Sequence, residues 1–364
     1  MPYPLISEYI EAIKLAEDNF EELSYLRPVM GDDGLPVMAN GNFAVVFKMK
    51  DERNGKLYAV KCFTKEQEGR AEAYRLITVE LEDVYSPYLY SVRYLDKELF
   101  VDTEQTNETE FPVLLMDWVE GKTLDKYLRE NLNDKYALEM LAYRFSLLAQ
   151  WLIPQPFAHG DLKPDNILVR EDGSLVLVDY DGMYVPAMRG LRARELGSPD
   201  FAHPQRSEVW FDEYIDDFSI VSILLSLQSI SISPFLYKKY GASDRLLFSC
   251  TDYRNLNNCV LFNIFVNSSN HDIRMLSLAL QKLSSSPIIH LSYNDLPLLI
   301  TFNDYYYGGE IGDNNPLAIE FLNEKANDWL NEIDLISKGF INNDDDDLED
   351  NVIDMTDEDF NDYY

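Results

Sequence analysis

The stretch His159-Gly160-Asp161-Leu162-Lys163-Pro164-Asp165-Asn166 runs into an apolar segment, and Asp179 follows thirteen residues after Asn166. A carboxylate such as Asp161 can accept the proton of a substrate hydroxyl, while Lys163 can neutralise charge on a phosphate in transfer. Asn166 and Asp179 offer the oxygen ligands that magnesium prefers. The spacing therefore predicts phosphoryl transfer; the alternative is a polar loop between a helix and a hairpin.

This stretch resembles the catalytic loop of the eukaryotic-like Ser/Thr protein kinase superfamily, which reads H-R-D-L-K-P-x-N and is followed by D-F-G. Gly160 stands in place of the arginine, and the second motif reads Asp179-Tyr180-Asp181-Gly182. That arginine normally docks a phosphorylated activation loop. The resemblance thus implies a kinase that is not switched on in that way. Small-molecule kinases, whose loops also often read H-G-D, remain an alternative.

The composition limits the classes of protein and of binding partner that fit this chain. The chain has 364 residues, of which 46% are hydrophobic, enough to build two lobes with a cleft between them. Its three cysteines are too few and too scattered for a disulfide framework or a zinc site, which favours a reduced, cytoplasmic protein. No apolar run is long enough to span a membrane. The net charge of −33 disfavours nucleic acid and anionic lipid as partners.

A strand pattern begins near residue 37 and contains Gly41 at the tip of an expected hairpin. Of the kinase pattern G-x-G-x-x-G-x-V, only this central glycine survives. Lys61 ends a following strand, where the kinase motif V-A-I-K places its lysine. The resemblance implies that Gly41 covers the phosphates of a nucleotide and that Lys61 contacts the α and β phosphates.

In kinases a glutamate on the next helix orients this lysine. Residues 66–84 have a helical pattern that offers Glu68, Glu72 and Glu80, and we assign the role to Glu72. Two short strands are expected at 89–95 and 99–103, and the last strand of the small lobe at 111–116.

The hinge between the lobes is expected at residues 117–124. The resemblance implies that the backbone of Asp117 and Val119 hydrogen-bonds adenine behind a gatekeeper-like Met116. Trp118 is as well explained by packing as by ligand contact. Beyond the hinge, residues 135–153 carry an apolar stripe at helical spacing, and Pro154 ends this helix before the catalytic loop.

A hairpin is expected after the catalytic loop, with its turn at Gly173. It brings Asn166 and Asp179 to neighbouring strand ends, where both can face one magnesium ion. Asp181 also precedes a glycine, but the interval from Asn166 favours Asp179 as the metal ligand. Asp181 either assists or caps the turn.

Residues 195–204 resemble the end of a kinase activation segment, with Gln205 in place of the usual glutamate. The run that begins at Asp216 and Asp217 looks like the central buried helix of the large lobe. In the family an aspartate at the start of this helix hydrogen-bonds the catalytic-loop backbone, and we assign that role to Asp217.

The remaining sequence predicts a helix at 315–337, which docks on the catalytic domain or binds a partner, and a tail at 341–364. The tail holds eleven acids and no Lys or Arg, typical of a solvated, disordered segment. A basic partner for it is the functional alternative.

Together these patterns predict an α+β, bilobal protein-kinase-like fold with a small β-rich lobe and a large helical lobe. The expected parts are a helical extension at 1–36, lobes at 37–118 and 119–290, a second helical extension at 291–340, and the acidic tail. The resemblance implies ATP- and magnesium-dependent phosphorylation of a Ser or Thr hydroxyl on a protein. A pseudokinase scaffold is the main alternative from another class.

Overall fold

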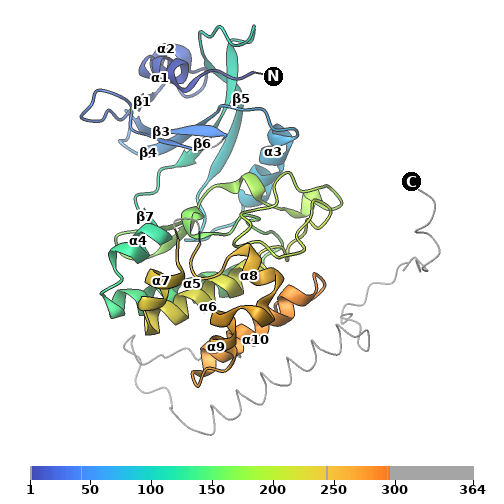
Figure 1. Cartoon of the computed structure of the whole chain (residues 1–364). Coiled ribbons are helices and arrows are strands. Elements are labelled where there is room, and N and C mark those ends of the chain that lie inside the picture. The colour runs from blue at the N-terminus through green and yellow to red at the C-terminus, as the bar shows by residue number, and fades with distance from the viewer. Residues whose placement is uncertain (1, 42, 243–244, 293, 296–364) are drawn as a thin grey trace, which may run out of the picture.

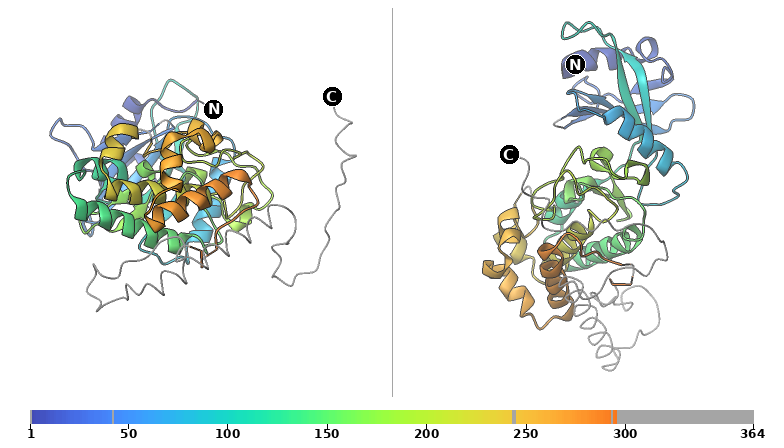
Figure 2. Two further views of the ribbon diagram at one scale, coloured as in Figure 1. Left: turned by 60° about the horizontal axis from the view of Figure 1, so that its bottom comes forward. Right: turned by 90° about the vertical axis from the view of Figure 1, so that its right-hand side faces the viewer.

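The computed structural model describes residues 2–41, 43–242, 245–292 and 294–295. They form a small lobe built on a curled sheet and a larger helical lobe beneath it, as Figure 1 and the side view in Figure 2 show. The predicted α+β, bilobal architecture is confirmed. The expected helix at 315–337 and the acidic tail lie outside the described residues.

Within the described residues, the small lobe holds a six-stranded antiparallel sheet in the order β1-β3-β4-β6-β5, with β2 also paired to β3. Its strands are β1 (Leu26–Pro28), β2 (Met38–Asn40), β3 (Ala44–Asp51), β4 (Leu57–Phe63), β5 (Val92–Phe100) and β6 (Glu110–Asp117). In β3 the side chains of Val45, Phe47 and Met49 are buried at alternate positions, and in β4 all residues from Ala59 to Phe63 are buried, which explains the strong strand pattern around Lys61.

The segment between residues 89 and 103 differs from the expected pair of strands. β5 is a single strand, because the polar residues between Leu95 and Leu99 shift its pairing register with β6 without ending the strand. Lys97 lies at this irregularity with a φ of 52°. A polar stretch that reads as a break in sequence is here a bulge within one strand.

The N-terminal segment packs on the sheet (Figure 1). It comprises α1 (Ile6–Lys14), α2 (Ala16–Asn19) and β1, so this segment contributes a strand as well as helices. Tyr9 and Ile13 of α1 are fully buried in the small-lobe core. The Tyr9 hydroxyl donates a hydrogen bond of 2.7 Å to the carbonyl oxygen of Phe63, at the end of β4. This helix therefore supports the strand that carries Lys61.

The large lobe is helical, with a small sheet of β7 (Lys122–Thr123), β8 (Ile167–Val169) and β9 (Leu175–Leu177). Its helices are α4 (Leu124–Glu130), α5 (Lys135–Leu152), α6 (Asp217–Ile232), α7 (Phe235–Tyr240), α8 (Cys250–Arg254), α9 (Val260–Val266) and α10 (His271–Ser285). Short 3₁₀ turns cover Pro164–Asn166, Tyr180–Gly182, Pro186–Met188 and Leu256–Asn258. α3 (Arg70–Leu81) belongs to the small lobe and packs beside β5.

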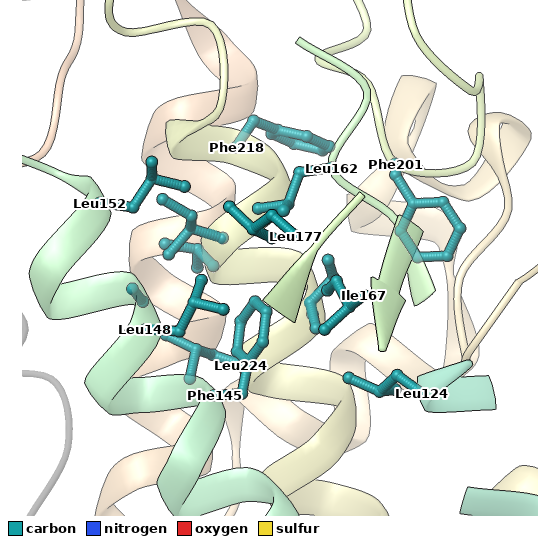
Figure 3. Close-up of a cluster of buried hydrophobic side chains, with 14 of the residues drawn as sticks. Leu124, Phe145, Leu148, Leu152, Leu162, Ile167, Leu177, Phe201, Phe218 and Leu224 are labelled. Carbon is teal, nitrogen blue, oxygen red and sulfur yellow. The ribbon is translucent and has the colours of Figure 1, made fainter. Parts of the chain in front are cut away.

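Buried side chains from α5, α6 and the β8–β9 hairpin form the core beneath the catalytic loop (Figure 3). Leu162 of that loop lies in this core, beside Leu177 of β9, and is 1% exposed. Since Leu162 separates Asp161 from Lys163, its burial fixes the frame from which both polar side chains project. None of the helices in the described ranges is long and apolar enough to cross a membrane.

The buried side chain of Ile13 anchors α1 on the small-lobe sheet. Replacing the buried Ile13 with alanine should lower the free energy of unfolding by about 2–4 kcal/mol, because the cavity lies against the sheet. Leu15→Ala is the matched control, since Leu15 is 60% exposed and its loss should cost under about 0.5 kcal/mol. Urea unfolding of both variants gives the comparison. Equal losses would mean that α1 does not depend on this burial.

Candidate active site

The catalytic loop holds Asp161 in a dense set of polar contacts. Lys163 Nζ lies 2.7 Å from Asp161 Oδ2, and Asn166 Nδ2 donates to the same oxygen at 3.0 Å. The backbone N–H of Ser198 donates to Asp161 Oδ1 at 2.6 Å. Lys163 Nζ also donates to Ser198 Oγ at 2.9 Å. The three residues predicted from the catalytic-loop motif are thus in contact with one another. Ser198, from the expected activation segment, contacts two of them.

These contacts determine the protonation state of Asp161. Burial alone would raise the pKa of its carboxyl, but the charge and hydrogen bond of Lys163 outweigh burial, and the net pKa is lowered. Asp161 is therefore an ionised carboxylate at neutral pH, able to accept a hydrogen bond from a hydroxyl.

The backbone of the loop is held from below by Asp216, which precedes α6. Asp216 Oδ2 accepts from His159 N–H at 2.5 Å, and Asp216 Oδ1 accepts from Gly160 N–H at 3.0 Å. The assignment of this role to Asp217 was wrong by one residue. Asp217 instead accepts from Leu291 N–H at 2.8 Å, because the first helical turn directs it toward the segment after α10.

The backbone at Gly160 leaves no room for a side chain. Its φ is +79°, and a Cβ at this residue would lie 1.9 Å from the carbonyl oxygen of Gly182. The glycine that replaces arginine is therefore required by the close approach of the two backbones. An arginine could not be restored here without moving the Asp179-Tyr180-Asp181-Gly182 segment.

That segment follows β9 and meets Lys61 of β4. Lys61 Nζ lies 2.8 Å from Asp179 Oδ1 and 2.7 Å from Asp181 Oδ2. Desolvation opposes the charge of Lys61, but the two carboxylates prevail and raise its pKa. Burial similarly opposes the charge of Asp179, while Lys61 lowers its pKa overall. Lys61 and Asp179 are thus charged together at neutral pH.

Asp179 adopts a left-handed backbone conformation, with φ of +67°. This is strained for a residue with a side chain. Tyr90 secures it: the Asp179 N–H donates to the Tyr90 hydroxyl at 3.2 Å, and the Tyr90 ring stacks on Tyr180 at 4.6 Å between centroids. In this backbone conformation the Asp179 side chain contacts Lys61 and lines the cavity.

Glu72 does not reach Lys61, so that assignment was wrong. The Glu72 side chain is 66% exposed and lies 3.5 Å from Arg75 on the same helix. α3 instead directs Tyr74 inward, and the Tyr74 hydroxyl donates to Asp181 Oδ1. The helix therefore acts on the lysine through a tyrosine and Asp181 rather than through a glutamate.

Asp181 is the residue whose importance the sequence understated. It is 7% exposed, its side chain bridges Lys61 and Tyr74, and its carbonyl oxygen accepts from Arg194 Nη2 at 2.6 Å. The sequence did contain an indication of this role, since D-Y-D-G places a carboxylate where D-F-G has glycine. Tyr74 left no such signal, because an inward tyrosine on an amphipathic helix usually packs in a core.

Between the lobes lies an open cavity of about 570 Å³. It is lined by Gly41, Lys61, Asp117, Val119, Asp161, Lys163 and Asp179, among others. The predicted residues are thus brought together around one space, except Glu72 and Asn166, neither of which lines it. Asn166 lies just beneath, 6% exposed.

The two ends of the cavity differ in chemistry. At the hinge, the backbone N–H of Trp118 already donates to Leu57 O at 3.2 Å, and the Asp117 side chain pairs with Lys56 at 2.6 Å. At the other end, Gly41 N–H donates to Ala44 O at 2.8 Å in a tight turn. An added Cβ at Gly41 would make only ordinary contact, so the turn does not strictly demand glycine.

The donor set suits magnesium held jointly with phosphates. Asn166 donates its Nδ2 to Asp161, which leaves its amide oxygen without a hydrogen-bond partner among the described residues, and Asp179 contacts Lys61 through one oxygen. No group of three or more His, Cys, Asp or Glu side chains in the described ranges could hold a metal by itself. Magnesium is commonly bound by one or two protein ligands together with substrate phosphates.

The family model of the protein kinase domain matches residues 35–236, more than half of the chain. The chain belongs to the protein kinase family. This match spans the glycine turn, Lys61, the catalytic loop and the whole of α6.

Several curated Ser/Thr kinases are similar to this kinase. The Caenorhabditis elegans serine/threonine-protein kinase sgk-1 is 24% identical over 217 residues, covering 57% of this chain and 44% of the relative. The Arabidopsis thaliana serine/threonine-protein kinase AtPK2/AtPK19 is 23% identical over 235 residues, covering 62% and 46%. The catalytic subunit of the Dictyostelium discoideum cAMP-dependent protein kinase is 22% identical over 176 residues, covering 46% and 25%. The chain thus spans less than half the length of these relatives.

The backbone contact at Gly160 predicts a large effect on the stability of this kinase. Gly160→Ala should lower the free energy of unfolding by at least about 3 kcal/mol, because left-handed strain and a backbone clash add together. Gly190→Ala is the matched control: its φ is +83°, but nothing lies within 4 Å of an added Cβ. Strain alone should cost about 1 kcal/mol there. Equal losses in thermal or urea unfolding would contradict the close approach.

Proposed function

We propose that this chain is an ATP- and magnesium-dependent Ser/Thr protein kinase. The observation that carries the proposal is the meeting of Lys61, Asp161, Lys163 and Asp179 around one open cavity, although Lys61 and Asp179 are 118 residues apart in sequence. Each has a charge suited to its role. The similarity to curated Ser/Thr protein kinases supports a protein substrate.

In the proposed reaction, Asp161 accepts the hydrogen bond of the substrate hydroxyl and takes its proton as the oxygen attacks the γ-phosphate. The bond between the γ-phosphorus and the β,γ-bridging oxygen breaks, and ADP leaves. Its Oδ1 is occupied by Ser198 N–H and its Oδ2 faces Lys163, so the carboxylate cannot rotate freely. Lys163 is placed to neutralise the transferring group. Positioning and electrostatic stabilisation of this kind supply most of the catalysis in phosphoryl transfer.

The nucleotide would lie with its adenine at the hinge, near Asp117 and Val119, and its phosphates toward Gly41 and Lys61. Asn166 and Asp179 would hold magnesium, which supplies charge neutralisation on the phosphates when bound. Lys61, kept charged by Asp179 and Asp181, would contact the α and β phosphates. In an acidic protein, this lysine and Lys163 provide the positive charge that the anionic nucleotide requires.

We further propose that the site is assembled without phosphorylation of the activation segment. The family's phosphate-docking arginine is replaced by Gly160, which has no room for a side chain. The segment has other anchors: Ser198 N–H on Asp161, Arg194 on Asp181 O, and Gln67 Nε2 donating to Glu195 Oε1 at 2.9 Å. These contacts need no added phosphate.

Asp161→Asn tests the catalytic assignment. The amide cannot take a proton, so the rate of γ-phosphate transfer should fall by about 10²–10⁴-fold, while binding of ATP changes little. Asp172→Asn, in the β8–β9 turn, is the control and should keep near wild-type transfer. Each variant is incubated with ATP labelled on its γ-phosphate, the rate of label transfer is measured, and the modified residue is identified. Full activity in Asp161→Asn would refute the assignment; ATP binding without transfer by the wild type would favour a pseudokinase.

Asp181→Asn tests how Lys61 is oriented. Loss of the carboxylate charge should weaken binding of ATP by at least about tenfold, about 1.4 kcal/mol, because Lys61 loses a buried partner. Tyr74→Phe should give a smaller loss in the same direction. Glu72→Gln, on the same helix as Tyr74, is the control and should bind ATP as the wild type does. Calorimetric titration with ATP and magnesium distinguishes them. A Glu72→Gln loss as large as that of Asp181→Asn would restore the glutamate assignment.

A further inference from the structure

A second, smaller cavity lies next to the catalytic loop and faces a different part of the substrate. It has a volume of about 190 Å³ and lies between the end of the activation segment and α8. Its lining includes Gly197, Pro199, Ala202, Arg206, Cys250 and Arg254.

The cavity is close to the proposed catalytic base. Gly197 forms part of its wall, and a Cβ at Gly197 would lie 3.4 Å from Asp161 Oδ1. The next residue, Ser198, donates its N–H to that same oxygen. Consecutive Cα atoms are about 3.8 Å apart. A substrate whose hydroxyl meets Asp161 therefore brings a directly adjacent residue within reach of this cavity.

The charge of the lining is unusual for this chain. None of the lining residues is an aspartate or glutamate, although the chain carries 64 acids against 31 Lys and Arg. Arg206 and Arg254 both line it, and neither makes an ion pair within the described residues. By contrast, Arg53 and Arg75 of the small lobe pair with Asp51 and Glu72.

The nearby carboxylates are already engaged elsewhere. Asp200 accepts from Cys250 N–H at 2.6 Å, and Asp252 accepts from the N–H and hydroxyl of Ser249 at the start of α8. Arg206 donates Nη1 to Ser207 O at 3.0 Å, while its Nη2 is buried without a partner in the described part of the chain. Asp212 and Asp216 act on Arg206 only through longer-range electrostatic attraction.

We propose that this cavity binds the carboxylate of an Asp or Glu that directly follows the phosphorylated Ser or Thr of the substrate. A guanidinium group donates in a fixed fork that matches a carboxylate, and an unpaired arginine gains most from such a partner. The small apolar walls from Pro199 and Ala202 leave room for a short acidic side chain beside Arg254. This inference rests on the proposed kinase function and names the class of its substrate.

The chain's own sequence provides a suitable probe. Within residues 341–364, Thr356 is the one Ser or Thr, and Asp357, Glu358 and Asp359 follow it. A peptide spanning residues 350–364 therefore has the proposed pattern. Changing Asp357 of this peptide to Ala or to Lys alters the side chain that would enter the cavity.

The experiment measures kcat/KM of the full-length kinase for these three peptides, together with a Ser/Thr peptide library varied at the position after the acceptor. We expect Asp and Glu to be preferred at that position, with the Asp357→Ala peptide about tenfold poorer and the Asp357→Lys peptide poorer still. Arg254→Ala in the kinase should remove most of this preference while leaving the rate on the alanine peptide unchanged. Arg254 is exposed, so this variant is expected to fold. Lys135→Ala, on α5, is the control and should keep the preference.

The outcomes separate the two proposals. If the wild-type kinase labels no peptide or protein with Ser or Thr, the proposed function fails and this inference with it. If peptides are labelled but the library favours apolar or basic residues after the acceptor, the inference alone is overturned. The same holds if an acidic preference persists in full in Arg254→Ala, because the cavity would then not be its source.

Discussion

The buried ion pair between Lys61 and Asp181 links the two lobes of this molecule. Lys61 comes from the small-lobe sheet, Asp181 from the segment after the large-lobe hairpin, and Tyr74 adds the helix α3 to the same carboxylate. Each charge would be unstable in the interior without the other. The pair therefore fixes where β4, α3 and the Asp179–Gly182 segment meet, and with them the walls of the cleft.

This arrangement explains two departures from the family pattern together. An aspartate in place of the last D-F-G residue supplies the carboxylate that the helix normally gives, so Glu72 is free to lie at the surface. Gly160, in place of the arginine, lets the catalytic loop approach the Gly182 backbone closely. The catalytic loop and the Asp179–Gly182 segment are thus packed directly against each other.

The fold and most of the candidate site were predictable because they depend on local patterns. The catalytic loop, the hairpin and the strand that carries Lys61 each have a short motif with fixed spacing. Tyr74, the choice between Asp216 and Asp217, and the single strand β5 were not predictable in this way. Each depends on how elements distant in sequence are rotated against one another: one helical position separates Glu72 from an inward face, and one residue separates two aspartates at the start of α6.

The most direct test of this account is an experimental structure with magnesium and a non-hydrolysable ATP analogue bound. We expect Lys61 Nζ to contact the phosphates while remaining within hydrogen-bonding distance of Asp181, with Tyr74 still on that carboxylate and Glu72 still at the surface. A structure in which α3 has rotated so that Lys61 pairs with Glu72 or Glu80, and Asp181 has left the lysine, would contradict it.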